Sequence, residues 1–112
     1  MDSKDKKVIM KILEHSNDIV SETAGINDAI EFKNNNDKSK SALFDLMQIG
    51  ELARNGLSEN AVRELNHIPW NQIYALRNRI VHGYAKVDYE IIWETIEYDI
   101  PELIKELESV EV

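Results

Sequence analysis

The stretch IPWNQIYALRNRIVHGY, residues 68–84, decides the fold because its apolar residues recur with the period of an α-helix. Pro69 suits the first turn of a helix and Gly83 suits its end, so the sequence predicts a helix between these two residues. At 3.6 residues per turn, one face of that helix is apolar, and its members are Trp70, Ile73, Tyr74, Ile80 and Val81. The sequence therefore predicts that this face packs against other helices.

The same period continues through most of the chain, and signals for β-strands are nearly absent. One helix is expected to follow Ser3 and to end at about Ser21. A polar connection with one short helical turn comes next, and a second long helix is expected after Asp37. Gly56 is expected to end that helix as a left-handed C-terminal cap, and Ser58 is expected to cap a short helix after it.

The last helix is expected to begin after Asp88, whose side chain can cap it. Pro101 falls inside this helix and lacks the N–H that the hydrogen-bond ladder needs, so an interruption is expected near Asp99. Residues 1–112 are long enough for one core and too short for two. The sequence therefore predicts a single all-α domain, an antiparallel bundle of four main helices plus short helical turns.

Composition excludes several classes of protein. The chain has no cysteine, so disulfides and thiolate metal sites are excluded. The N-terminus MDSKDKKVIMKILEHS lacks the apolar core of a signal peptide, and no apolar run approaches the roughly 20 residues of a membrane span. The expected location is the cytoplasm, without membrane attachment.

The charge is unevenly distributed along the chain. The net charge is −8, which argues against non-specific binding of nucleic acid. However, residues 66–87 contain no acidic residue, and Arg77, Arg79 and Lys86 make this segment cationic. A local cationic patch on an acidic body favours a small anionic site over a long nucleic-acid groove.

Arg77 lies at the centre of the apolar helix face, whereas Arg79 is expected to point towards solvent. A guanidinium among apolar side chains is unfavourable unless it is paired or faces a functional cleft. Glu51 falls between Phe44 and Met47 on the apolar side of the earlier helix, so an ion pair between Arg77 and Glu51 is one explanation. A functional cleft is the other.

The residues around Arg77 form a recognisable pattern. Asn78 follows the arginine, His82 comes five residues after it, and Tyr84 comes two residues later. This pattern resembles the R-x4-H-x-Y motif of HepT-like toxins, which are helical proteins of the HEPN superfamily. Three stretches extend the resemblance over roughly residues 40–105: DLMQIGELARNGLSENA, IPWNQIYALRNRIVHGY and VDYEIIWETIEYDIPEL.

The resemblance implies a HEPN-like fold and metal-independent cleavage of RNA. His82 can act as base or acid near neutral pH, and Arg77 can offer its planar donors to a phosphate. Asn78 would support them by orienting the imidazole or binding the phosphate. No cofactor is expected, and the histidines have no ligand spacing that indicates a metal.

Two features limit a site made by one chain. Arg77 and His82 are five residues apart, so they diverge by about 140° around a regular helix. One chain also supplies one imidazole, whereas acid–base cleavage works best with two proton-transfer groups. The resemblance implies a homodimer, in which two copies of both residues meet.

The resemblance also implies a partner, a nucleotidyltransferase antitoxin that attaches AMP to the tyrosine of the motif. Carried over, Tyr84 is the AMP acceptor, and the modified residue silences the toxin. Two alternatives remain open. In the first, the chain is a non-catalytic helical subunit of a nucleotidyltransferase complex. In the second, it is a plain structural bundle in which Arg77 and Glu51 form only an internal ion pair.

Overall fold

The computed structural model of the protein describes residues 1–110, in which the regular structure is helical throughout and no strand occurs. The long helices are α1 (Ser3–Thr23), α3 (Asn36–Glu51) and α5 (Trp70–Gly83), and the fourth rod joins α6 (Tyr89–Glu94) to α7 (Ile100–Glu108). Short helices α2 (Ala29–Asn34) and α4 (Glu59–Glu64) lie in the connections. The predicted all-α fold of four main helices plus short turns is confirmed. Among residues 1–110, none of the helices has the length and apolar character of a membrane span.

Two π-helical segments lengthen these rods. η1 (Leu52–Gly56) continues α3, and η3 (Thr95–Asp99) connects α6 to α7. Pro101 lies in the first turn of α7, directly after η3. A proline has no N–H for the hydrogen-bond ladder and its ring collides with the preceding turn, and the wider π-turn of η3 makes room for it. The predicted interruption near Asp99 is therefore confirmed, and its form is a widened turn. A 3-10 turn, η2 (Tyr84–Lys86), follows α5.

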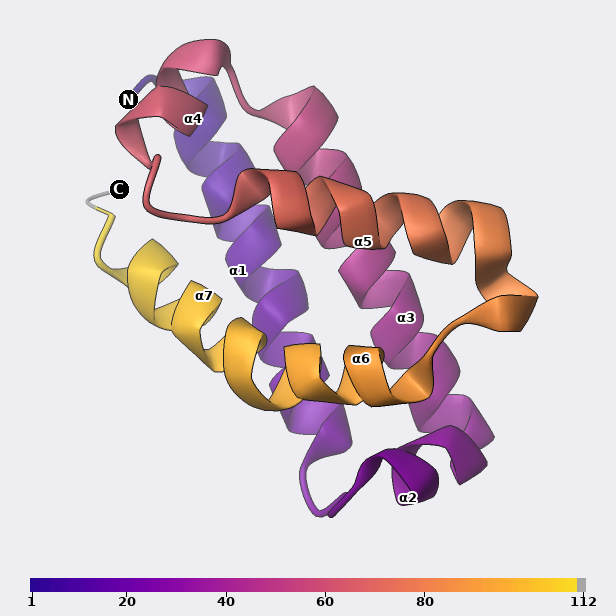
Figure 1. The fold of residues 1–112 in the computed structure, drawn as a ribbon. Coiled ribbons are helices and arrows are strands. Elements are labelled where there is room, and N and C mark those ends of the chain that lie inside the picture. Colours follow the sequence, from indigo (N-terminus) through magenta and orange to yellow (C-terminus); the bar gives the residue numbers. More distant parts are fainter. Residues whose placement is uncertain (111–112) are drawn as a thin grey trace.

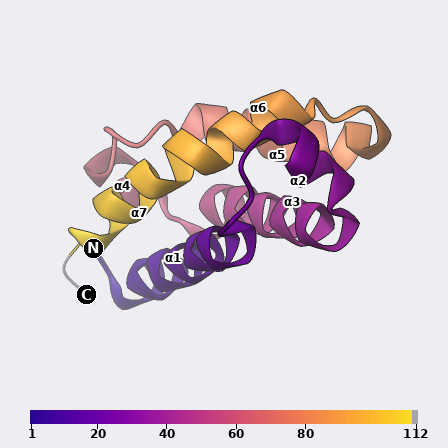
Figure 2. The same cartoon turned by 90° about the horizontal axis from the view of Figure 1, so that it is seen from below.

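The rods form two layers, each an antiparallel pair (Figure 1). α1 and α3 make one layer, while α5 and the α6–α7 rod run in opposite directions across it. The view from below separates the layers, with α1 and α3 on one side and α5, α6 and α7 on the other (Figure 2). The helices are thus antiparallel within a layer and cross between layers.

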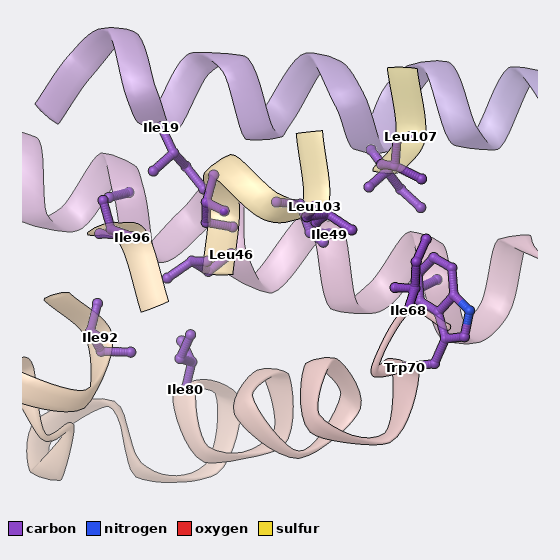
Figure 3. Packing of buried hydrophobic residues seen from close by; sticks show 14 of the residues in the cluster. Ile19, Leu46, Ile49, Ile68, Trp70, Ile80, Ile92, Ile96, Leu103 and Leu107 are labelled. Carbon is purple, nitrogen blue, oxygen red and sulfur yellow. The ribbon is translucent and has the colours of Figure 1, made fainter. Parts of the chain in front are cut away.

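The core lies between the two layers, where apolar side chains from every main rod meet (Figure 3). Trp70 anchors the start of α5, and its indole N–H donates to the Leu65 carbonyl at 3.0 Å. Trp93 packs against Phe32 of α2 with ring centroids 5.4 Å apart, which holds α2 on α6. Both tryptophans are core anchors, as the helical period predicts. The labelled core residues are Ile19, Leu46, Ile49, Ile68, Trp70, Ile80, Ile92, Ile96, Leu103 and Leu107.

A buried carboxylate joins α1 to the start of α4. Ser58 donates its backbone N–H to Asp5 Oδ1 at 2.9 Å and its hydroxyl to Asp5 Oδ2 at 2.6 Å. The Ser58 hydroxyl oxygen also accepts from the Ala61 N–H, which is the predicted N-cap. These hydrogen bonds from Ser58 hold the pKa of the Asp5 carboxyl below its ordinary value.

Gly56 has a different role from the predicted one. Gly25 is the only described residue with a positive φ, so Gly56 is not a left-handed cap. A Cβ added at Gly56 would lie 3.0 Å from Val8 Cγ1 of α1. The expectation of a left-handed cap was wrong: glycine is suited to this position because η1 approaches α1 closely.

Candidate active site at the end of α5

α5 crosses α3 at Gly50, where α3 has no side chain. A Cβ added at Gly50 would lie 2.7 Å from Arg77 Cγ and 3.4 Å from the Ile73 carbonyl oxygen. The aliphatic stem of Arg77 therefore lies directly over Gly50, and no larger residue fits there without a shift of α5. This contact explains how an arginine occupies the centre of an apolar helix face: its stem packs while its guanidinium continues past α3.

The guanidinium of Arg77 is paired within the chain. Arg77 Nη2 lies 2.7 Å from Glu51 Oε2, and Nη1 donates to Asn78 Oδ1 at 3.0 Å. Glu51 Oε1 in turn accepts from Asn55 Nδ2 at 2.6 Å. Among the described residues, Arg77 Nε is buried without an acceptor. The pair is partly accessible, with 23% of the Arg77 side chain and 41% of the Glu51 side chain exposed, and it compensates the arginine charge.

His82 lies in a different environment, at the edge of a hollow of about 490 Å³ between the end of α5 and α6. Asn78 also lines this hollow, whereas Arg77 does not. Asn78 therefore connects the Arg77–Glu51 ion pair to the hollow, because it accepts a hydrogen bond from Arg77 and also lines the hollow with His82. The structure therefore brings Asn78 to both residues but does not bring Arg77 and His82 into one cavity of a single chain.

The hollow has a cationic rim and an apolar wall. Arg79 and Lys86 both line it, and neither forms an ion pair within residues 1–110. One carboxylate, that of Asp88, also lines the hollow, and its Oδ1 accepts from the Glu90 and Ile91 N–H groups at the start of α6. Arg79 is exposed as the sequence predicts, but its place beside His82 was missed. The signal that could have found it was the spacing, because residues three apart on a helix, such as Arg79 and His82, are neighbours on its surface. The apolar lining consists of Leu76, Ile80, Val87, Ile91 and Ile92.

Tyr84 is exposed at the surface in η2, directly after Gly83. Its ring does not line the hollow. Gly83 ends α5 as predicted, with a φ of −141°, so the chain turns from the helix without a left-handed residue. Tyr84 is accessible to another protein.

The other two histidines pair with carboxylates. His67 Nε2 lies 2.8 Å from Glu106 Oε2, and His15 Nδ1 lies 2.8 Å from Asp45 Oδ1. Burial raises the pKa of the Asp45 carboxyl, and the hydrogen bond with His15 opposes that effect. His15, Asp18 and Asp45 offer ligand atoms within 4.8 Å of one another, the only such group in the described part of the chain. This group could not be predicted from the sequence, because Asp45 comes from a different helix.

The comparisons with known proteins agree with one another. A family model described as "Ribonuclease HepT-like" matches residues 12–110. "Putative RNase MJ1380" of Methanocaldococcus jannaschii is 35% identical over 106 residues, which cover 94% of each chain. "Putative RNase MJ1216" of the same organism is 32% identical over 94% of this chain and 85% of its own length. "Probable ribonuclease HepT" of Thermococcus cleftensis is 32% identical over 62 residues, 55% of this chain and 56% of its own. No solved structure matches the chain significantly.

Proposed function

Because the chain belongs to the HepT-like ribonuclease family, we propose that it is a metal-independent endoribonuclease whose site combines Arg77, Asn78 and His82 of two copies of the chain. The observation that supports this most directly is the environment of His82. His82 lines a hollow that Arg79 and Lys86 also line, together with Asn78, which accepts a hydrogen bond from the motif arginine. An anionic, flexible substrate fits these features.

The proposed reaction is attack by a ribose 2′-hydroxyl on the adjacent phosphodiester. The 2′-oxygen forms a bond to phosphorus as a base removes its proton, and the bond from phosphorus to the 5′-oxygen breaks as an acid protonates that oxygen. The products are a 2′,3′-cyclic phosphate and a 5′-hydroxyl. An imidazole can serve as base or acid, and a guanidinium can stabilise the charge that develops on the phosphorane.

The reaction needs two proton-transfer groups, which is the reason to propose a homodimer. One chain has a single imidazole at the site, and its Arg77 is turned towards α3 and paired with Glu51. Phe44 lies seven residues before Glu51 and Val81 four after Arg77, so each shares a helix face with the ion pair. Both are exposed apolar side chains, 53% and 39% respectively. An apolar border around a charged pair favours contact with a second copy over contact with water.

The biological role that we propose is that of a toxin neutralised by a nucleotidyltransferase antitoxin, which adds AMP to Tyr84. The accessibility of Tyr84 supports this proposal, because a phenol that is 49% exposed can enter another active site. An adenylate there would add a phosphate close to Lys86, two residues on, and would compete with RNA for the same cations. As a site of action, we propose the cytoplasm.

The ion pair of Arg77 with Glu51 favours a second candidate, a non-catalytic helical subunit of a nucleotidyltransferase complex. An arginine that is already paired binds a phosphate less strongly than an unpaired one, because the carboxylate competes for its donors. Cleavage of RNA by the purified protein separates the two candidates.

The test is RNA cleavage by the purified chain and by three variants, with and without EDTA. Arg77→Ala and His82→Ala are each expected to abolish cleavage, and EDTA is expected to leave the wild-type rate unchanged. His67→Ala is the matched control, because His67 is also an exposed histidine but lies outside the hollow, where it pairs with Glu106. Circular dichroism must show that the Arg77→Ala protein folds, because its Glu51 partner loses an ion pair. Activity that EDTA removes and magnesium restores would overturn the mechanism, and no cleavage by the wild type would favour the non-catalytic candidate.

A further inference from the structure

The cations that line the hollow together with His82 do not include the arginine of the motif. Arg77 lies outside the hollow and forms an ion pair with Glu51, with Nη2 2.7 Å from Oε2. Arg79 and Lys86 line the hollow together with His82. Within residues 1–110, neither Arg79 nor Lys86 has a carboxylate partner. Asp88 is the one carboxylate that lines the hollow, so Arg79 and Lys86 together leave its lining with a net positive charge.

We propose that the hollow beside His82 is a subsite for one nucleotide of single-stranded RNA, in which Arg79 and Lys86 bind the phosphate and the apolar wall receives the base. This inference rests on the proposed ribonuclease function. It assigns substrate binding to two residues outside the motif, and it leaves to Arg77 the stabilisation of charge during the reaction.

The size and lining of the hollow fit this occupant. Its volume of about 490 Å³ lies within the range of roughly 300–1,000 Å³ that is typical of small-molecule sites. Ile91 is partly exposed on the wall, and Ile80 and Ile92 lie behind it. A base has two apolar faces and a polar edge, so one face can lie against aliphatic side chains while the edge remains in water. The base must be unstacked to enter, which selects single-stranded RNA over a duplex.

Asn78 supplies a polar contact at the edge of the hollow. Its Oδ1 accepts from Arg77, which fixes the orientation of the amide. No acceptor among the described residues pairs with its Nδ2, so this group can donate to a phosphate oxygen or to a base edge.

The neighbouring surface limits the RNA to this end of α5. A groove between α5 and α7 shares Leu76, Arg79 and Ile91 with the hollow. The far wall of that groove contains three carboxylates, those of Asp99, Glu102 and Glu106. Phosphates are repelled there, so the strand is expected to leave the hollow towards η2 and away from α7.

The experiment measures binding of a 12-nucleotide fluorescein-labelled single-stranded RNA to the His82→Ala protein, which does not cleave it, by anisotropy at several KCl concentrations. The double variant Arg79→Ala/Lys86→Ala is made in that background. The logarithm of the association constant falls linearly with the logarithm of the salt concentration. Loss of two phosphate contacts is expected to make this slope less steep by about 1.4, since each contact to a single strand contributes about 0.7. Ile91→Ser is expected to weaken binding several-fold at every salt concentration without changing the slope.

The matched control is Arg63→Ala/Lys105→Ala, which removes one arginine and one lysine at exposed positions of α4 and α7, outside the hollow. Made in the same His82→Ala background, it is expected to keep the slope of the His82→Ala protein. An equal loss of slope in both double variants would mean that only overall charge matters, and it would overturn the subsite. An unchanged slope for Arg79→Ala/Lys86→Ala, with cleavage intact in the wild type, would overturn the subsite and leave the proposed function standing. RNA that is neither bound by the His82→Ala protein nor cleaved by the wild type would overturn both.

Discussion

At the scale of single residues, the chain places ionisable groups in environments that only the folded structure creates. Asp5 and Asp45 are both buried, and the pKa of the first is lowered while that of the second is raised. The difference comes from their partners, because Asp5 accepts two hydrogen bonds from Ser58 whereas Asp45 has one, shared with His15. The two groups therefore contribute with opposite signs to the pH dependence of stability.

The carboxyl of Asp5 is expected to stabilise the fold at neutral pH. Its folded-state pKa is lowered, so its contribution is present above the ordinary carboxyl pKa of about 3.9 and is lost as the pH falls through the folded-state value. Asp5→Asn should lower the melting temperature at pH 7, and the gap to the wild type should narrow below about pH 4. Thermal melts followed by circular dichroism between pH 7 and pH 2 measure this. A gap that stays constant with pH, or the same narrowing in the exposed control Asp37→Asn, would contradict the assignment.

Tyr84 provides a second prediction at this scale. Co-expression with the cognate nucleotidyltransferase should increase the mass of the protein by one or more adenylates, because the Tyr84 phenol is exposed. Tyr84→Phe keeps the ring and removes the acceptor oxygen, so this variant should show no increase and should escape neutralisation. Tyr98, which is also exposed, supplies the control Tyr98→Phe, and that variant should be modified like the wild type. Adenylates that persist in Tyr84→Phe would place the modification at another residue.

At the scale of helices, the crossing of α3 and α5 determines where the motif arginine lies. The crossing is close because Gly50 has no Cβ, and the Arg77 stem fills the space above it. Gly50→Ala should therefore separate the two helices and displace Arg77 from Glu51. The expected loss is about 1–3 kcal/mol in the free energy of unfolding, as for other overpacked contacts, together with a loss of RNA cleavage.

Urea denaturation and a cleavage assay test this prediction together. Gly83→Ala is the control for stability, because a Cβ at Gly83 would meet no atom within 4 Å. It should be neutral or slightly stabilising, since glycine is less favourable than alanine at the end of a helix with negative φ. If Gly50→Ala is as stable as the wild type, α5 does not rest on Gly50.

The boundaries of these helices could be predicted from the sequence wherever the residues that set them are close together in the chain. Ser58, Asp88 and Pro101 mark their boundaries through hydrogen bonds or clashes within four residues, so they could be predicted. Gly50 and Gly56 could not, because a close approach depends on which helices meet. The site divides in the same way. The motif indicated Arg77, Asn78 and His82, and the spacing of three residues places Arg79 beside His82 on α5. The position of Lys86 beside His82 could not be predicted, because it depends on how the chain turns after Gly83.

At the scale of the whole molecule, an exposed apolar border around a charged pair favours self-association. The expected state is a homodimer at micromolar concentration, with α5 at or beside the two-fold axis. Val81→Asp should shift the protein towards the monomer and reduce cleavage, because it places a charge in the proposed interface. Val20→Asp is a matched control, since Val20 on α1 is similarly exposed, 42% against 39% for Val81. Light scattering that finds a monomeric wild type, or equal effects of both substitutions, would contradict this interface.

The π-helical segments have a consequence for how the length of this chain can change in evolution. Hydrogen bonds in a π-helix span five residues in place of four, so η1 and η3 each hold one residue more than a continuous α-helix needs. A deletion of one residue within 52–56 or 95–99 can be absorbed by closing the segment into α-helix. At η3 the helices α6 and α7 on either side then keep their direction, and at η1 the rod of α3 ends one residue earlier. The same deletion within α5 would rotate every later residue by about 100° and carry His82 away from its hollow. Gains and losses of single residues are therefore expected to accumulate at the two π segments and to be absent from α5.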